Sequence, residues 1–239
     1  GVQSLVKERA QAPTATADVY ADESGVPRYV FQREGTADRA LDAHPPVAAL
    51  PSYCEALHFG SLTLAQARDW PAWREAVEEA RRRGAFIALD INVRPPLIDE
   101  MTSYLARVEE AIELSSWVKA SDEDVLGLWP NKDPEDVVRT WASNSKVSIL
   151  TRGSEGAWLF TETGATAHVS DPLEQSDIQD TGGAGDTFHA ACLAWLHHHG
   201  ALGDPISEFQ GRELLRFACK AARINCERQG GDPPTLAEI

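Results

Sequence analysis

The hydrophobic pattern of the chain changes near Pro45, from short alternating stretches to continuous apolar runs separated by amphipathic segments. Before that point, residues 14–20 and 28–32 are rich in side chains that favour strands, and the polar residues 22–25 between them are typical of a turn. We predict that these segments pair as an antiparallel hairpin, a small β flap over about residues 14–40.

Beyond Pro45, short apolar runs alternate with segments in which apolar residues recur at helical spacing. Such runs are typical of strands buried on both faces of a parallel sheet, and such segments are typical of the helices that cover it. The predicted strands are residues 56–60, 86–90, 117–120, 147–151, 156–160 and 166–169. The predicted helices are residues 64–83, 99–114, 133–143, 184–199 and 207–228, with a further helix that begins at Ser121.

This order of elements predicts an α/β fold with three layers, in which a mostly parallel sheet lies between two layers of helices. We assign all 239 residues to one domain, with the β flap at about 14–40 and the α/β core at about 45–239. A chain of this length can bury a full hydrophobic core, and its contents of 43% hydrophobic and 25% charged residues are those of a globular protein.

The net charge of −15 and the pI near 4.8 argue against nucleic acid and anionic membrane surfaces as partners. This charge does not argue against a nucleotide ligand, because a local binding site on an acidic protein can still be positively charged. The four cysteines, Cys54, Cys192, Cys219 and Cys226, lack the spacing of metal ligands, so we expect reduced thiols. With no apolar run of membrane-spanning length and no signal peptide visible, we expect a cytoplasmic protein.

The most specific motif is the run D-T-G-G-A-G-D-T-F at residues 180–188, which leads from a polar loop into an Ala-rich helix. Gly183, Ala184 and Gly185 would open that helix with their backbone amides facing outward, as an anion hole. Asp186 stands beside them and would accept the proton of an attacking hydroxyl, a combination that suits phosphoryl transfer. A Gly-rich helix cap, with an Asp favoured by the helix dipole, is the purely structural alternative.

Polar residues also follow the predicted strand 86–90, at the sheet edge where ligands of parallel sheets bind. Asn92 and Arg94 alternate there, so their side chains can share one side of the chain. A guanidinium in that place would grip a phosphate or a sugar oxygen. The alternative is an Arg–Asp pair that stabilises the loop.

Two further strand ends carry candidate residues, each with a structural alternative. Asp124 lies in the first turn of the helix opened by Ser121, where it would either cap the helix or organise Mg²⁺ through water. Thr151, Gly153 and Gly156 would either let a nucleotide approach the backbone closely or form a plain hairpin turn.

Taken in order, these segments resemble the ribokinase family of carbohydrate kinases, of the phosphofructokinase-B type, and most of all its bacterial fructokinases. The resemblance covers the chain from about Thr14 onward, and its signature is residues 180–186. Other landmarks of the family match Asp90-x-Asn92-x-Arg94, Lys119-x-Ser121-x-x-Asp124, Thr151-x-Gly153-x-x-Gly156 and the tail 219–234.

The resemblance implies a kinase that transfers the γ-phosphoryl group of ATP to a ketose, with fructose favoured, Asp186 as the base and Gly183, Ala184 and Gly185 as the anion hole. The resemblance also implies the residues of each pocket. The nucleotide pocket would be lined by Thr151, Gly153, Gly156, Cys219 and Gly231. The sugar would contact Phe31, Arg33, Asn92, Arg94 and Asp186. Asp124 would bind Mg²⁺ through water, and Asp180 with the carbonyl oxygen of Gly182 would bind K⁺. Family members also suggest a homodimer that pairs through the β flap.

Two alternatives stay open within this resemblance: a 2-keto-3-deoxygluconate kinase, and a non-catalytic relative that binds a nucleotide or a sugar. The family begins with a strand that carries a substrate-binding Asp, followed by a Gly-Gly-x-x-x-Asn loop, and neither precedes the β flap here. We therefore expect that the sequence is an incomplete record of a longer protein, a true truncation being the alternative. A nicotinamide-linked dehydrogenase is disfavoured, because no fingerprint glycine loop opens the chain.

Overall fold

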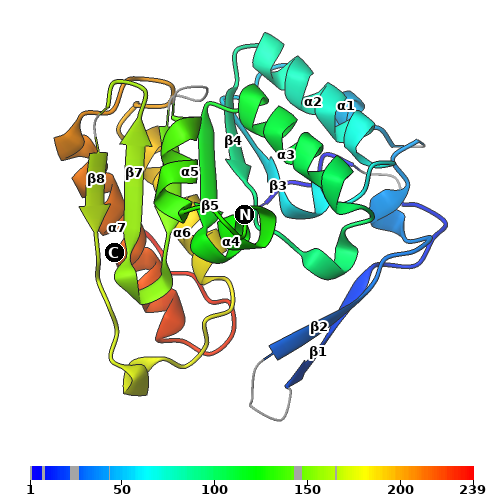
Figure 1. The fold of residues 1–239 in the computed structure, drawn as a ribbon. Helices are drawn as coiled ribbons and strands as arrows, with labels where there is room; N and C mark the ends of the chain where they lie inside the picture. Colours follow the sequence, from blue (N-terminus) through cyan, green and yellow to red (C-terminus); the bar gives the residue numbers. More distant parts are fainter. Residues whose placement is uncertain (1, 7–8, 22–26, 43, 143–146, 165) are drawn as a thin grey trace.

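The structure is a computed structural model that describes residues 2–6, 9–21, 27–42, 44–142, 147–164 and 166–239. Figure 1 shows a six-stranded sheet between two layers of helices, with a two-stranded hairpin that projects from one side. The predicted α/β fold with three layers and a small β flap is confirmed.

The strands of the large sheet follow one another in space in their chain order, from β3 to β8. Strands β3 to β6 are parallel, and β7 and β8 extend the sheet in antiparallel fashion. Their bounds are β3 Ala56–Gly60, β4 Phe86–Asp90, β5 Trp117–Ser121, β6 Val147–Thr151, β7 Ala157–Thr161 and β8 Thr166–Val169. The prediction of a mostly parallel sheet is therefore confirmed.

Helices cover both faces of this sheet. The helices α2 to α5 pack on one face, while α6 and α7 pack on the other. The bounds are α1 Pro46–Ala49, α2 Trp70–Arg82, α3 Met101–Leu114, α4 Asp122–Leu128, α5 Pro134–Trp141, α6 Ala184–His198 and α7 Glu208–Cys226. Among the described residues, no helix is both long and apolar enough to cross a membrane. All four cysteines are free, as predicted.

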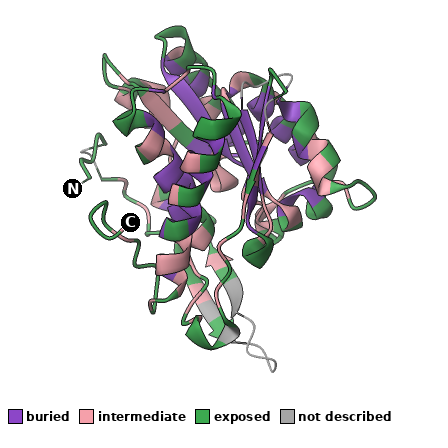
Figure 2. Ribbon diagram, turned by 90° about the vertical axis from the view of Figure 1, so that its left-hand side faces the viewer, coloured by how far each residue is buried: buried purple, intermediate pink, exposed green. Residues whose placement is uncertain are grey.

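The core explains why the central strands appear as continuous apolar runs. On β4, Ile87 and Leu89 pack towards α2 and α3, whereas Phe86 and Ala88 pack towards α6 and α7. All four side chains are buried, and Figure 2 shows the buried sheet between its two helical layers. A strand covered on both faces has no polar face, so its sequence does not alternate.

Helix α2 begins six residues later than predicted, at Trp70 instead of residue 64. Pro71 favours this start, because proline lacks an amide and fits the first turn of a helix. The buried Arg107 also donates hydrogen bonds to the carbonyl oxygens of Leu64 (2.8 Å) and Ala65 (3.1 Å). The residues before Trp70 are therefore held as an irregular segment by a side chain of α3.

The β flap consists of β1 (Thr16–Ala21) and β2 (Pro27–Gln32), which pair in antiparallel fashion with Thr16 opposite Gln32. The predicted hairpin is confirmed, although its predicted turn at residues 22–25 lies outside the described residues.

Candidate functional site

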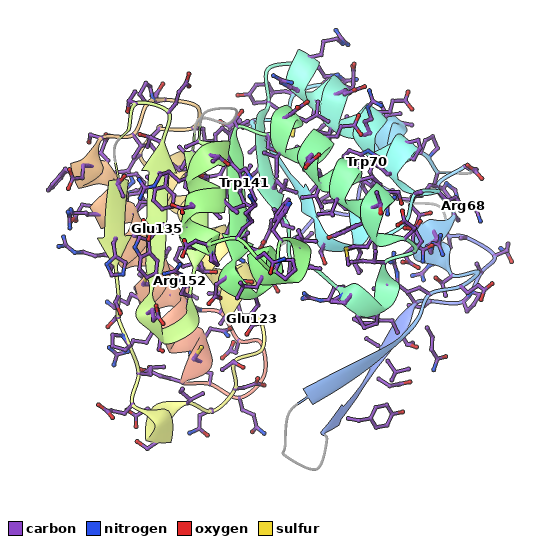
Figure 3. The ribbon with its side chains drawn as sticks, viewed as in Figure 1. Arg68, Trp70, Glu123, Glu135, Trp141 and Arg152 are labelled. Carbon is purple, nitrogen blue, oxygen red and sulfur yellow. The ribbon has the colours of Figure 1, made fainter. Side chains whose placement is uncertain are left out.

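A cavity of about 420 Å³ lies at the carboxyl ends of β5 and β6, beside the start of α6. Figure 3 labels Glu123 and Arg152, which lie at this end of the sheet. The cavity brings together many of the residues singled out from the sequence: Asn92, Asp124, Thr151, Gly153, Gly156, Ala184, Gly185 and Cys219. Gly183, Asp186 and Arg94 are not among its lining residues, so the predicted base stands next to the lining residue Gly185 at the edge of the cavity.

The glycine loop turns into α6 through Gly183, which has a left-handed conformation with φ of 75°. The amide of Ala184 donates to the carbonyl oxygen of Thr181 at 3.2 Å, in a turn. The amides of Gly183, Gly185 and Asp186 have no hydrogen-bond partner in the part of the chain that the structure describes. An anion at this helix start would therefore meet unpaired donors, but the Ala184 amide is already engaged.

Helix α7 and the tail behind it hold the glycine loop in place. The buried Asn225 of α7 donates from Nδ2 to the carbonyl oxygen of Gly182 at 2.9 Å. Asp180 accepts from the amide of Gly182 at 2.7 Å and from that of Gly230 at 3.1 Å. The loop is thus tied at two points to residues more than forty positions away in the chain.

These hydrogen bonds lie at or beside residues that are predicted to bind K⁺ or the nucleotide. Both carboxylate oxygens of Asp180 and the carbonyl oxygen of Gly182 already accept hydrogen bonds within the protein, and their binding of K⁺ stays a prediction. Gly231 lies behind Gly183, with its Cα 3.7 Å from the position of a Cβ built there, and it does not line the cavity.

Asp186 and Asn92 meet beside the glycine loop. Asn92 lies just beyond β4 in a left-handed conformation with φ of 42°, and its Nδ2 is 3.5 Å from Oδ1 of Asp186. Arg94 folds back and donates from Nη1 to Oδ1 of Asn92 at 2.6 Å. The alternative Arg–Asp pair is not formed, since Asp90 pairs with Lys119 instead. Arg94 therefore orients the amide of Asn92 towards the predicted base.

Asp124 ties two loops together through its buried carboxylate. Oδ1 accepts from the amide of Val93 at 2.7 Å and Oδ2 from the amide of Ser121 at 2.8 Å. Ser121 Oγ in turn accepts from the amide of Asp124 at 3.0 Å, which completes a capping box at the start of α4. The capping role is thus visible in the structure.

The side chains near Asp124 limit how Mg²⁺ could be bound. The described residues contain no cluster of three His, Cys, Asp or Glu side chains that would hold a metal ion. Since both oxygens of Asp124 accept amides, Mg²⁺ near it would be carried by phosphate oxygens and water, as the predicted water bridge requires.

The hairpin between β6 and β7 forms one wall of the cavity. It contains a 3-10 turn at Gly153–Glu155, and Gly153 has φ of 47°. A Cβ on Gly156 would lie 2.1 Å from the carbonyl oxygen of Val169, so the approach of β8 already requires glycine there. Cys219 of α7 forms the opposite wall, and burial, with a smaller effect of Asp171, raises its pKa to about 12.

Two predicted sugar contacts lie away from this cavity. Arg33 pairs with Asp38, with Nη2 2.7 Å from Oδ2, and Phe31 belongs to β2 of the flap. Neither residue lines the cavity, so their contact with a sugar stays a prediction.

The sequence interpretation missed a buried charged cluster under the start of α6. Lys119 of β5 lies 2.9 Å from Asp90 of β4, and His189 of α6 lies 3.5 Å from the same carboxylate. The signal was present: Lys119 interrupts an apolar strand two residues after the buried Trp117, so it faces the same side and requires a buried partner.

Comparison with known proteins finds carbohydrate kinases. The profile of the pfkB family of carbohydrate kinases matches residues 1–237. A fructokinase of Rhizobium leguminosarum bv. trifolii is 35% identical over 177 residues, which are 72% of this chain and 52% of the relative. Probable fructokinase-3 of Arabidopsis thaliana is 29% identical over 95% of this chain and 65% of its own. The chain thus spans between about half and two thirds of the length of these relatives.

Solved structures share the fold. Fructokinase with bound ATP from Xylella fastidiosa is 23% identical, with a TM-score of 0.80 over 96% of this chain and 73% of that one. Fructokinase from Vibrio cholerae O395, in the form with fructose, ADP and calcium ion, is 23% identical, with a TM-score of 0.77 over 93% of this chain and 70% of that one.

Proposed function

Because the chain belongs to the pfkB family of carbohydrate kinases, we propose that it transfers the γ-phosphoryl group of ATP to a hydroxyl group of a ketose, with fructose as the favoured acceptor. One observation carries the proposal most directly. The unpaired amides of Gly183 and Gly185 start a helix beside Asp186, at the edge of a cavity at the carboxyl end of the sheet. Donors for a phosphoryl group and an acceptor for a proton thus lie side by side.

In the proposed reaction, the acceptor hydroxyl attacks the γ-phosphorus and loses its proton to Asp186. The bond from the γ-phosphorus to the bridging oxygen breaks, and ADP leaves with that electron pair. The amides of Gly183 and Gly185 hold the phosphoryl oxygens as negative charge develops, while Nδ2 of Asn92 orients the carboxylate of Asp186. Mg²⁺ carried by the nucleotide would neutralise phosphate charge.

The two substrates have separate proposed places. We place the nucleotide in the cavity between the β6–β7 hairpin and α7, where Thr151, Gly153 and Cys219 form the walls. We place the sugar on the side of Asn92 and Arg94, with Phe31 and Arg33 of the flap as further contacts.

The β flap is also the surface that we propose for a homodimer. Its register places Asp18 opposite Val30, so Val30 and Tyr20 share one face of the hairpin. Their side chains are 51% and 58% exposed. An isolated two-stranded hairpin is marginally stable, and pairing with a second flap would cover these side chains. The free cysteines support the proposed cytoplasmic location.

A coupled assay of ADP release tests the function. The full natural protein, with ATP and Mg²⁺, would be given a panel of ketoses, 2-keto sugar acids and nucleosides. We expect fructose to give the highest kcat/KM. A higher value with 2-keto-3-deoxygluconate would favour that alternative kinase. Nucleotide binding without ADP release for any acceptor would favour the non-catalytic relative and contradict the proposal.

A further inference from the structure

A buried ion pair lies directly under the first turn of α6. Lys119 and Asp90 are opposite each other in the parallel register of β5 and β4. Nζ of Lys119 is 2.9 Å and 3.1 Å from the two oxygens of Asp90, and both side chains are 5% exposed. Buried charges are expensive to desolvate, and a pair of apolar residues would serve the core at least as well.

The ammonium group of Lys119 reaches the glycine loop. It lines the cavity, and a Cβ built on Gly185 would lie only 3.2 Å from Nζ. An ammonium has three N–H donors, and Asp90 is its only partner among the residues described. The absence of a side chain at Gly185 thus allows a positive charge to approach the positive end of helix α6. This arrangement favours an anion between them.

His189 supports Asp90 from the other side. It lies one turn after Gly185 on α6, is 2% exposed, and places Nδ1 3.5 Å from Oδ2 of Asp90. Neither ring nitrogen makes a hydrogen bond of good geometry within the described part of the chain. Burial alone would raise the pKa of Asp90, but the charge of Lys119 and the contact with His189 hold it below its usual value. The carboxylate therefore stays ionised and fixes the position of the ammonium.

We propose that Lys119 is a phosphoryl-binding residue of this site: its ammonium group binds the anion held by the amides of Gly183 and Gly185, and Asp90 is the positioning residue that aims it. The inference rests on the proposed kinase function and adds a charged donor to its anion hole. The competing interpretation is an ion pair that only stabilises the contact between the sheet and α6.

Three variants of the full natural protein separate these interpretations. Lys119→Met keeps the length of the side chain and removes its charge. The double variant Asp90→Asn with Lys119→Met also removes the carboxylate that the first change leaves unpaired, so it keeps a neutral and foldable core. Lys132→Met is the matched control, because Lys132 is exposed and does not line the cavity. Folding would be checked by circular dichroism and thermal unfolding.

We expect both variants without Lys119 to lose kcat by about 100-fold, the usual effect of losing one transition-state donor, while Lys132→Met keeps it. By calorimetry, we expect their affinity for the non-hydrolysable ATP analogue with an imido bridge to fall by about 10-fold, and their affinity for adenosine to stay unchanged. The analogue carries the phosphates and adenosine does not. The two losses together would place the ammonium at the phosphoryl group.

If the double variant folds and regains the kcat of the wild type, the pair is structural and the proposal is overturned. Equal affinity for the analogue in wild type and in both variants would overturn it as well. Failure of the kinase function itself looks different, because the wild type would then release no ADP with any acceptor. The binding comparison between the analogue and adenosine would still test Lys119 in that case.

Discussion

Asn92 approaches Asp186 with its side-chain amide, Nδ2 lying 3.5 Å from Oδ1, although the two residues are 94 positions apart in the chain. The separation is at the outer limit of a hydrogen bond. It joins the loop after β4 to the first turn of α6. Because Arg94 holds the other end of the Asn92 amide, three polar residues form a line that ends at the predicted base.

Replacing the predicted base should remove turnover without removing the nucleotide. For Asp186→Asn we expect kcat to fall by about 1,000-fold or more, because the amide cannot accept the proton of the attacking hydroxyl. Calorimetry should show an unchanged affinity for ATP. Asp204→Asn, an exposed change between α6 and α7, is the control and should behave as wild type. Near-normal turnover of Asp186→Asn would reject the assigned role.

The unusual backbone of Asn92 gives a second prediction. Asn92 and Ser61 are the non-glycine residues with positive φ in the described chain, at 42° and 48°. We expect Asn92→Gly to change the free energy of unfolding by less than about 1 kcal/mol, because glycine accepts this conformation freely. Its kcat should fall by about 10-fold, since Asp186 loses its donor.

Ser61→Gly is the matched control for this backbone effect, because it relieves a similar conformation at a residue that does not line the cavity. It should keep the wild-type kcat. Equal losses of kcat in the two variants would show that the amide of Asn92 does not act on Asp186. Urea unfolding and steady-state kinetics measure both quantities.

Asp124 should contribute to stability through the two loops that it ties. Removal of its carboxylate in Asp124→Ala leaves the partly buried amides of Val93 and Ser121 unpaired and breaks the capping box, so we expect a loss of about 2 kcal/mol in the free energy of unfolding. Glu123→Ala removes the same charge from the same helical turn, but its side chain is exposed, and we expect a change within about 0.5 kcal/mol. Urea unfolding with excess EDTA tests this prediction independently of Mg²⁺. Equal stabilities of the two variants would contradict it.

Much of the fold could be predicted from the sequence, because the strands are bounded where apolar runs meet polar residues. The predicted bounds of β3, β4, β6 and β8 agree with the structure. The start of α2 could not be predicted from periodicity, since it depends on Arg107, a side chain that reaches back from the following helix. Local patterns carry no information on such tertiary hydrogen bonds.

The segments that form the candidate site could be predicted from the sequence, but the hydrogen bonds between them could not. The motif at residues 180–188 indicated a helix start, and the structure has α6 begin there. The engaged amide of Ala184 and the line from Arg94 to Asp186 depend on turn geometry and on how distant loops pack. No spacing in the sequence fixes either of them.

Cys219 should be unreactive although it lines the cavity. Burial raises its pKa to about 12, so at pH 8 about one thiol in 10,000 is ionised. We expect iodoacetamide at pH 8 to label the half-buried Cys54 well before Cys219, as followed by peptide mass spectrometry. In urea both should react at similar rates. Fast labelling of Cys219 in the folded protein would contradict the assigned burial.

The buried pair of Asp90 and Lys119 should make stability depend on acidity. The pKa of Asp90 is lowered in the fold, so its ionised form is stabilising above its unfolded pKa of about 4. This stabilisation is lost as the pH falls further, through the folded pKa, because the unfolded chain takes up the proton first. The wild type should therefore lose more unfolding free energy between pH 5 and pH 3 than the Asp90→Asn, Lys119→Met double variant. Parallel losses in urea titrations would contradict the shift.

Asn225 has a consequence for how loss-of-function variants of this protein would be interpreted. It is fully buried on α7 and does not line the cavity, yet its Nδ2 donates to the carbonyl oxygen of Gly182 and its Oδ1 accepts from Oγ1 of Thr187 at 3.3 Å. In a mutational scan, we expect substitutions at this position to group with those of the glycine loop, although Asn225 itself does not line the cavity. A buried residue of the last long helix would thus be scored together with the loop that it holds.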